Sequence, residues 1–272
     1  MSGFFGIMTV PFLACLVLAG IHAYLGLHVI EREIIFVDLA LAQIAILGAT
    51  IGYVCGHGLD SAYSYWLSLG FTLVGATIFS LTRYQKQRIP QEAIIGITYA
   101  VSAALMFLLL SRSGEGDEHL RAAIVGNVLL VTPAEVLKIA VIYSAIGVFH
   151  FVFRGRFLAV SKDHVQASKS LNVRFWDFLF YASFGVVVTS SVAIAGVLLV
   201  FSFLVVPAAC AVLFADSVRS RLAIGWTIGF LGSVAGITAS YVFDLPTGAS
   251  VVCAFGGILL FLSIVKKVLT EI

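Results

Sequence analysis

The sequence predicts an all-α, polytopic integral membrane protein, a bundle of about nine transmembrane segments, on three observations. Of its 272 residues, 61% are hydrophobic and only 11% are charged, whereas soluble domains contain about 25% charged residues. Apolar stretches long enough to cross a hydrocarbon core of about 30 Å recur along the chain. Lys and Arg are concentrated in the loops on one side of that pattern. We therefore expect a single transmembrane domain over residues 1–272.

Nine apolar segments are expected to span the membrane, each close to the ~20 residues that a helix needs. The first is too long for the apolar part of a signal peptide and lacks basic residues before it, so we interpret it as a retained span. The sixth is short and close to the seventh, which predicts a broken or re-entrant pair joined near Thr189, Ser190 and Ser191. The predicted spans cover residues 6–29, 34–55, 62–82, 91–111, 133–153, 175–189, 192–214, 222–243 and 247–265.

The basic residues predict the orientation of the chain, because Lys and Arg near span ends are retained on the cytoplasmic face. Of the sixteen, only Arg112 and Arg121 fall in a loop on the other side, and Lys138 sits just inside a span. The N-terminus is therefore expected outside and the C-terminus inside. The basic residues on the predicted inner side are Arg32, Arg83, Lys86, Arg88, Arg154, Arg156, Lys162, Lys169, Arg174, Arg219, Arg221, Lys266 and Lys267.

Small residues and one proline predict how the spans pack. Pro207 lies inside the seventh span, where a proline frees a carbonyl one turn back and is expected to kink the helix, either for packing or at a binding site. Small residues three and four apart share one helix face and let helix backbones approach closely in lipid. Such faces consist of Gly225, Gly229, Gly232 and Gly236 in the eighth span, and of Ala45, Gly48, Ala49 and Gly52 in the second.

Several function classes lack their signatures in this chain. A GxxxxGK[ST] phosphate loop, a GxGxxG turn, an HExxH pair and a CxxCH motif are all missing. The four cysteines are scattered through apolar segments without CxxC spacing, which indicates neither a disulfide framework nor a zinc site. No long basic stretch suggests nucleic-acid binding. We therefore expect a transporter rather than an enzyme.

Ionisable side chains within spans are costly and often functional. Asp38 lies one turn into the second span with Gln43 a little deeper, and we interpret this pair as the candidate metal-contacting residues. Glu92 in the first turn of the fourth span either complements the helix dipole or serves function. His22 is expected to be a buried hydrogen-bonded group or a ligand. The residues expected at the cytoplasmic interface are His150 and Asp177.

Several motifs follow one another in a familiar order. They run from Glu31 to Gly48, from Pro90 to Ile97, through Gly126-Asn127, from Val160 to Ala167, from Gly196 to Ala209, and from Asp244 to Gly248. Together they resemble the membrane permeases of zinc/manganese-type ABC importers along nearly the whole chain. The resemblance implies a permease subunit in the bacterial inner membrane that forms the translocation path for a divalent metal.

The second span departs from the pattern of that family, which reads Gly-Asp-Ala-Leu-Ser-His. Alignment on Phe36-Val37 and Gly48 places Asp38 at the glycine, Leu39 at the aspartate and Gln43 at the histidine. Asp38 is thus displaced by about 100° around the helix, and a Gln carbonyl is a poor ligand for Zn²⁺. The chain is expected to pass a metal without that ligand pair, or to carry another ion or a chelate.

The resemblance also implies partners. We expect a homodimer in membrane lipid, a separate cytoplasmic ABC ATPase that uses the ATP, and an extracytoplasmic substrate-binding protein; the chain itself is expected to bind no cofactor and no nucleic acid. Residues 163–171 of the longest inner loop are predicted to fit a cleft in the ATPase or to remain a solvated loop. We call them the coupling segment, with Asp163, Ala167 and Leu171 as its candidate contact residues.

Two other functional classes remain open at this point. A stand-alone secondary transporter would be driven by an ion gradient, and such proteins often show inverted repeats and several intramembrane charges. Neither feature is clear in this sequence. A membrane-embedded assembly subunit would leave the order of the motifs unexplained.

Overall fold

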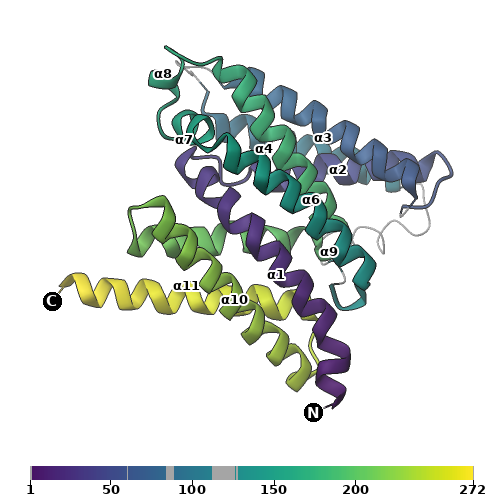
Figure 1. Cartoon of the computed structure of the whole chain (residues 1–272). Helices are drawn as coiled ribbons and strands as arrows, with labels where there is room; N and C mark the ends of the chain where they lie inside the picture. The colour runs from purple at the N-terminus through teal and green to yellow at the C-terminus, as the bar shows by residue number, and fades with distance from the viewer. Residues whose placement is uncertain (1, 60, 84–88, 112–125, 127, 272) are drawn as a thin grey trace. The chain divides into compact units, whose positions relative to one another are not determined.

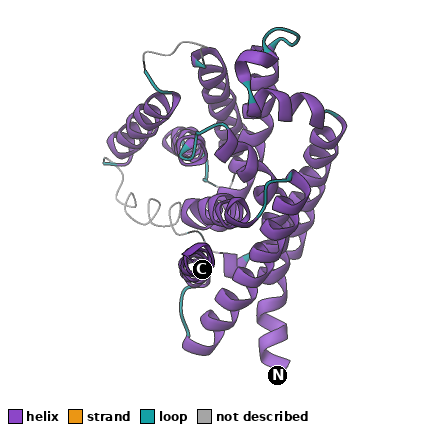
Figure 2. Ribbon diagram, turned by 90° about the vertical axis from the view of Figure 1, so that its left-hand side faces the viewer, coloured by secondary structure: helices purple, strands orange, loops and turns teal. Residues whose placement is uncertain are grey.

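The computed structural model describes residues 2–59, 61–83, 89–111, 126 and 128–271, and the described part contains helices and loops without strands (Figure 2). This confirms the all-α fold class. The helices are labelled in Figure 1. In chain order they are α1 Ser2–Glu31, α2 Val37–Val54, α3 Ala62–Thr82, α4 Gln91–Leu110, the short 3₁₀ helix η1 Val128–Leu130, α6 Pro133–Val152, α7 Arg154–Lys162, α8 His164–Ala167, α9 Val173–Phe214, α10 Val218–Phe243 and α11 Thr247–Glu271.

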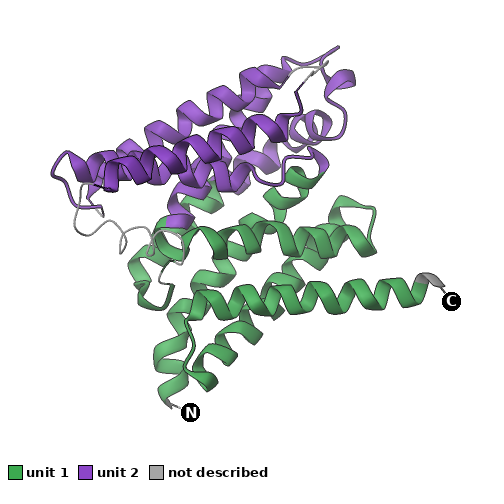
Figure 3. Cartoon of the chain, turned by 180° about the vertical axis from the view of Figure 1, so that it is seen from behind, with its two compact units in different colours: residues 1–30, 124–145, 193–272 green, residues 31–123, 146–192 purple. Residues whose placement is uncertain are grey.

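The helices belong to two compact units (Figure 3). Unit 1 contains residues 1–30, 124–145 and 193–272, and unit 2 contains residues 31–123 and 146–192. The expectation of a single domain over residues 1–272 stays a prediction. Lys86, Arg88, Arg112 and Arg121 lie outside the described residues, and the predicted orientation likewise stays a prediction.

Unit 1 is packed along the glycine face of α10, as the spacing of its glycines predicts. A Cβ at Gly229 would lie 2.8 Å from the Cβ of Ala19 in α1, and one at Gly236 would collide with the backbone of Val251 in α11. Gly26 of α1 lies against the backbone carbonyl of Leu204 in α9 in the same way. The helices of unit 1 therefore meet backbone to backbone, which maximises van der Waals contact where lipid offers no hydrophobic driving force.

Unit 2 is organised around α2, which packs against both α3 and α4. The small residues of α2 face α3: a Cβ at Gly48 would lie 2.8 Å from the backbone of Leu67 and Ser68, and one at Gly52 would lie 2.5 Å from the Ser64 hydroxyl. This confirms the predicted close packing of the second span. Leu47 joins Met106 and Leu110 of α4 in an apolar cluster on the other side.

Eight of the described helices are long and apolar enough to cross a membrane, and one of them, α9, extends over 42 residues. A continuous helix of that length would measure about 63 Å, twice the hydrocarbon core. It is broken at Gly196, whose φ of 74° and ψ of 164° are not helical. Residues 173–195 and 197–214 on either side each approach the ~20 residues of one span, in keeping with the predicted count of about nine.

The break lies five residues beyond the predicted junction, and this corrects the sequence interpretation. Thr189, Ser190 and Ser191 continue the helix, and the Ser191 hydroxyl donates to the Val187 carbonyl at 2.6 Å. Hydroxyls that bond to carbonyls one turn earlier can remain inside a helix. Gly196 adopts its backbone conformation without a steric penalty because it lacks a Cβ. Gly126, also at positive φ, lies directly against the backbone of Ala195 and Gly196.

The kink expected at Pro207 stays a prediction. The residue with non-helical dihedral angles inside α9 is Gly196, and Pro207 lies within the helix that follows it. Pro207 is buried, and its carbonyl lies 3.7 Å from the place where a Cβ on Gly225 would be. Its position therefore matches the packing alternative, with α10 covering the backbone around the proline.

Candidate functional site

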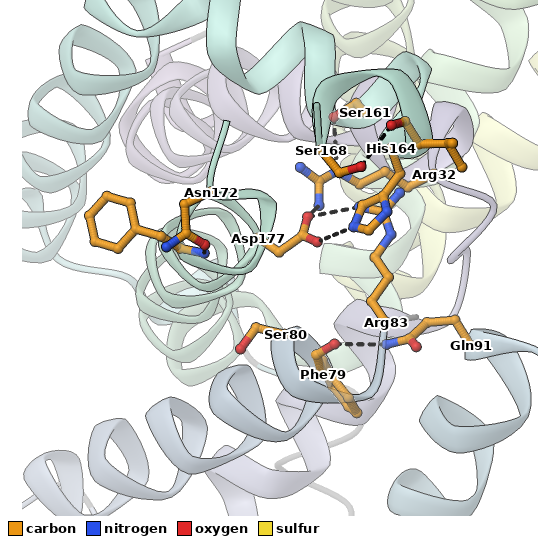
Figure 4. Close-up of polar contacts among 12 residues, drawn as sticks. Arg32, Phe79, Ser80, Arg83, Gln91, Ser161, His164, Ser168, Asn172 and Asp177 are labelled. Carbon is orange, nitrogen blue, oxygen red and sulfur yellow. Dashed lines mark hydrogen bonds and ion pairs between the residues drawn. The ribbon is translucent and has the colours of Figure 1, made fainter. Parts of the chain in front are cut away.

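A buried group of charged and polar side chains occupies the end of unit 2 that is predicted to be cytoplasmic (Figure 4). The Asp177 carboxylate, near the start of α9, is its centre. Asp177 Oδ1 accepts from Nη1 of Arg32 at 2.7 Å and from Nη1 of Arg83 at 2.8 Å, while Oδ2 lies 3.1 Å from Nε2 of His164. Arg32 Nε donates to the Ser161 hydroxyl at 2.8 Å. These five residues are called the Asp177 cluster.

The members of the Asp177 cluster come from separate elements. Arg32 follows α1 in the link to α2, and Arg83 caps the C-terminal end of α3. Ser161 belongs to α7, His164 begins α8, and Asp177 lies in the second turn of α9. One carboxylate thus connects the ends of three long helices with the two short helices of the loop between α6 and α9.

Burial makes these contacts energetically important. The side chains of Arg32 and Asp177 are 0% and 1% exposed. Burial lowers the pKa of the Arg32 guanidinium, while the Asp177 carboxylate opposes that shift, and Arg32 keeps its charge because an arginine is not deprotonated in proteins. The guanidinium also lies 3.8 Å from the centre of the Phe180 ring, where it gains a cation–π contact.

Asp177 is predicted from the sequence to lie at the cytoplasmic interface, and this stays a prediction. Its side chain is buried, and so is Arg32, which the charge pattern counts only as a loop residue. In the sequence, the only indications of the Asp177 cluster are an acid beside Trp176 at one span end and the arginines Arg32 and Arg83 at two other span ends. Which of these side chains meet depends on contacts between residues up to 145 positions apart, and one sequence does not show such contacts.

The coupling segment is ordered in part by its own residues. Asp163 caps α8, because its carboxylate accepts from the Gln166 backbone N–H at 2.9 Å. Ala167 is only 6% exposed, and Leu171 is half-buried. Ala167 and Leu171 are thus shielded from solvent to different degrees, while Asp163 is exposed and shapes the start of α8. The ATPase-contact role of these three residues stays a prediction.

Further residues in and beside α8 are exposed. Val165 is 52% exposed, and Gln166 and Lys169 are exposed beside it. Lys162 at the end of α7 is also exposed. Val165 is thus an exposed valine flanked by polar and basic side chains at the end of unit 2 that is predicted to be cytoplasmic.

Asp38 and Gln43 lie on α2 with little exposure, 1% and 6%. Asp38 is in the first turn, where its Oδ1 accepts from the Leu39 N–H at 2.8 Å. Among the residues that the structure describes, no three His, Cys, Asp or Glu side chains gather in a way that could hold a metal ion. The metal-contacting role of Asp38 and Gln43 stays a prediction.

Glu92 acts on the start of α2 from the first turn of α4. Its Oε1 accepts from the backbone N–H of Phe36, the N-cap residue of α2, at 3.0 Å. The Glu92 carboxylate is also close enough to Asp38 to interact with it electrostatically. Glu92 therefore satisfies a helix N-terminus of a neighbouring helix in addition to lying at the N-terminus of its own.

The buried histidines have local partners. His22 of α1 is 0% exposed, and its Nδ1 lies 2.8 Å from the Leu18 carbonyl oxygen. His150 of α6 is 1% exposed, lies 2.8 Å from the Ser183 hydroxyl, and stacks on Phe157 with ring centres 4.1 Å apart. His150 thus packs between α6, α7 and α9, and its predicted interfacial position stays a prediction.

The chain matches the family model described as "ABC 3 transport family" over residues 5–266. It is 28% identical over 222 residues to "Manganese transport system membrane protein MntC" of Listeria innocua, covering 79% of this chain and 78% of that protein. It is 25% identical over 234 residues to "Probable iron transport system membrane protein" of Haemophilus influenzae, covering 86% and 80%.

A solved structure supports the fold. The chain superposes on a chain of PsaBC from Streptococcus pneumoniae, determined in complex with a Fab, with a TM-score of 0.78 and 22% sequence identity. The match covers 96% of this chain and 94% of the other. At this identity the superposition shows the fold alone, and the chemistry of the cargo has to be argued from residues.

Proposed function

This chain belongs to the ABC 3 transport family, and from that premise we propose that it is the membrane permease subunit of an ABC-type importer for divalent metal ions. It forms the translocation path in the bacterial plasma membrane while a separate subunit hydrolyses ATP. The observation that carries this proposal is the family match over residues 5–266, which covers most or all of each of the eight described helices able to span a membrane. Family membership favours it over a stand-alone secondary transporter.

Manganese is the first cargo to test, and iron and zinc are tested in the same assay. The two relatives named above are described as manganese and iron transport proteins, so family membership alone leaves the metal open. The test is ATP-driven uptake of Mn²⁺, Fe²⁺ and Zn²⁺ into proteoliposomes that hold the permease, its ATPase and its binding protein. Uptake of none of the three, with ATP hydrolysis intact, would contradict a divalent metal cargo.

Asp38 and Gln43 are proposed to line the metal path through α2. Their burial inside a predominantly apolar helix supports this role, because polar side chains within spans are costly and often functional. Asp38→Ala should reduce uptake of the transported metal while ATP hydrolysis by the complex continues. Unchanged uptake and unchanged metal binding in Asp38→Ala would remove this residue from the path.

The ATPase is proposed to bind the exposed face of α8, and a binding protein to dock on the opposite side of the membrane. The exposure of Val165, Gln166 and Lys169 supports the first contact. Co-purification of the ATPase with the wild-type permease, compared with a permease whose residues 163–171 are scrambled, tests it. Retention of the ATPase by the scrambled variant would contradict the proposal.

A homodimer is proposed as the assembled form. Large apolar side chains along α11 stay exposed, including Leu260, Phe261 and Ile264, and they are available to lipid or to a second copy. Native mass spectrometry of the complex in lipid nanodiscs would show two permease chains per assembly. One permease chain per assembly would contradict the homodimer.

A further inference from the structure

We propose that His164 and Asp177 form a positioning pair that carries movement of the coupling segment into the membrane helices of unit 2. His164 acts through Asp177 and does not touch the cargo. The inference rests on the proposed function, since it assumes that an ATPase binds α8. It goes further by naming the side chain through which ATPase closure would reach α3 and α9.

The first argument is that α8 cannot hold its own position. It has four residues, His164–Ala167, and one turn of isolated helix is unstable because nucleation is unfavourable. Its fixed points are the Asp163 cap, the buried Ala167 and the contact from His164 to Asp177. Of these three, only the contact made by His164 reaches a charged group of a membrane-spanning helix.

The second argument concerns which groups a movement of His164 would reach. An ionised carboxylate only accepts hydrogen bonds, so His164 Nε2 carries the proton and donates to Oδ2. Oδ1 of the same carboxylate holds Arg32 and Arg83. A displacement of His164 therefore acts on a group that the ends of α1 and α3 share. Charge-assisted hydrogen bonds in a buried site are strong and directional. The contact between His164 and Asp177 should therefore keep its geometry when α8 moves.

The third argument separates transmission from folding. Arg32 and Arg83 already compensate the charge of Asp177, and Arg32 is further held by Ser161 and the Phe180 ring. The fold of the cluster therefore does not depend on His164, whose side chain is 14% exposed at the margin. Its contact with Oδ2 can be removed while the two arginine contacts remain.

The test uses the whole complex in proteoliposomes, with ATP hydrolysis and Mn²⁺ uptake measured in the same vesicles. His164→Ala should bind the ATPase and hydrolyse ATP, but the Mn²⁺ transported per ATP should fall about tenfold, the effect of losing one hydrogen bond to a charged group. His164→Gln should restore most of the ratio, because its amide can donate to Oδ2. His57 is an exposed histidine of the same unit whose ring lies beside that of Tyr63 at a tilt, and His57→Ala should leave the ratio unchanged.

A His164→Ala complex with the wild-type ratio overturns the inference. Loss of the folded complex in His164→Ala also overturns it, since the pair would then be structural. If the wild-type complex hydrolyses ATP but moves no Mn²⁺, that result counts against manganese as the cargo in the proposed function. Stimulation of ATP hydrolysis by the binding protein then replaces uptake as the readout, and undiminished stimulation in His164→Ala overturns the inference.

Discussion

The two units of this protein hold their helices together by different means. In unit 1, α1, α9, α10 and α11 meet through glycine and alanine faces that bring backbones into contact. In unit 2, α2 and α3 also meet through small residues, but the predicted cytoplasmic end is held by the Asp177 cluster. Added side-chain volume destabilises closely packed backbones, whereas removal of one partner destabilises a buried ion pair. The two units should therefore fail under different substitutions.

The largest expected effect is the loss of the central carboxylate. Asp177→Ala leaves the Arg32 guanidinium buried without its counter-ion, and breaking a buried pair in this way costs about 3–5 kcal/mol. Denaturant titration in detergent micelles measures the change in the free energy of unfolding. Arg83→Ala is the matched control and should cost less, because that side chain is 12% exposed and leaves the Arg32–Asp177 pair intact. Equal losses in the two variants would show that water already solvates the cluster.

The corresponding test of unit 1 adds volume at its tightest contact. Gly26→Val places a side chain against the Leu204 carbonyl, and overpacking should lower the free energy of unfolding by about 3 kcal/mol. Gly6→Val in the same helix is the control, because nothing lies within 4 Å of the added Cβ. The same titration compares the two variants, and similar stabilities would mean that α1 and α9 do not pack backbone to backbone.

A smaller effect is expected at the break in α9. Gly196→Ala puts a Cβ on a residue with φ of 74° and ψ of 164°, a region used almost only by glycine, and should cost about 2 kcal/mol. Gly70→Ala in α3, where the added Cβ meets nothing, should be neutral or slightly stabilising. The readout is the unfolding midpoint in detergent. A neutral Gly196→Ala would argue that residues 189–201 form an uninterrupted helix.

The smallest effect on stability, with a large effect on assembly, is expected at α8. Val165→Asp alters an exposed side chain and should change the free energy of unfolding by no more than about 0.5 kcal/mol. It should nevertheless abolish co-purification of the ATPase, because a charge replaces the apolar centre of the proposed contact. Val165→Leu should retain the ATPase. Retention by Val165→Asp would place the contact elsewhere on the inner surface.

The sequence predicts the fold well because its signals are local. Apolar length identifies the spans, and the glycine spacing in α10 identifies its packing face. The sequence predicts the junction at residues 189–191 because three consecutive hydroxyl residues are typical of a loop when their carbonyl partners are unknown. A single glycine within an apolar stretch does not by itself predict a break in a helix. Two facts together indicate the position of the break. A helix of 42 residues is too long for one span, and Gly196 can adopt a non-helical backbone conformation.

The candidate site was predictable only in part. Residues 163–171 stand out as a polar loop with helical character, but which side chains face outward depends on how α8 lies against unit 2. Val165 and Ala167 both look like apolar loop residues in the sequence, yet one is 52% exposed and the other 6%. Arg32, Arg83 and Asp177 are individually ordinary for span ends, and only the fold shows that they share one carboxylate.

The break at Gly196 also bears on how this protein can be mapped biochemically. Because a single residue separates the two halves of α9, a reporter or protease site placed between them would have no loop to occupy. An experiment that tags only the loops would then count eight crossings instead of the predicted nine. An even count places both chain ends on one side of the membrane, and an odd count places them on opposite sides. Labelling the two termini directly avoids this error.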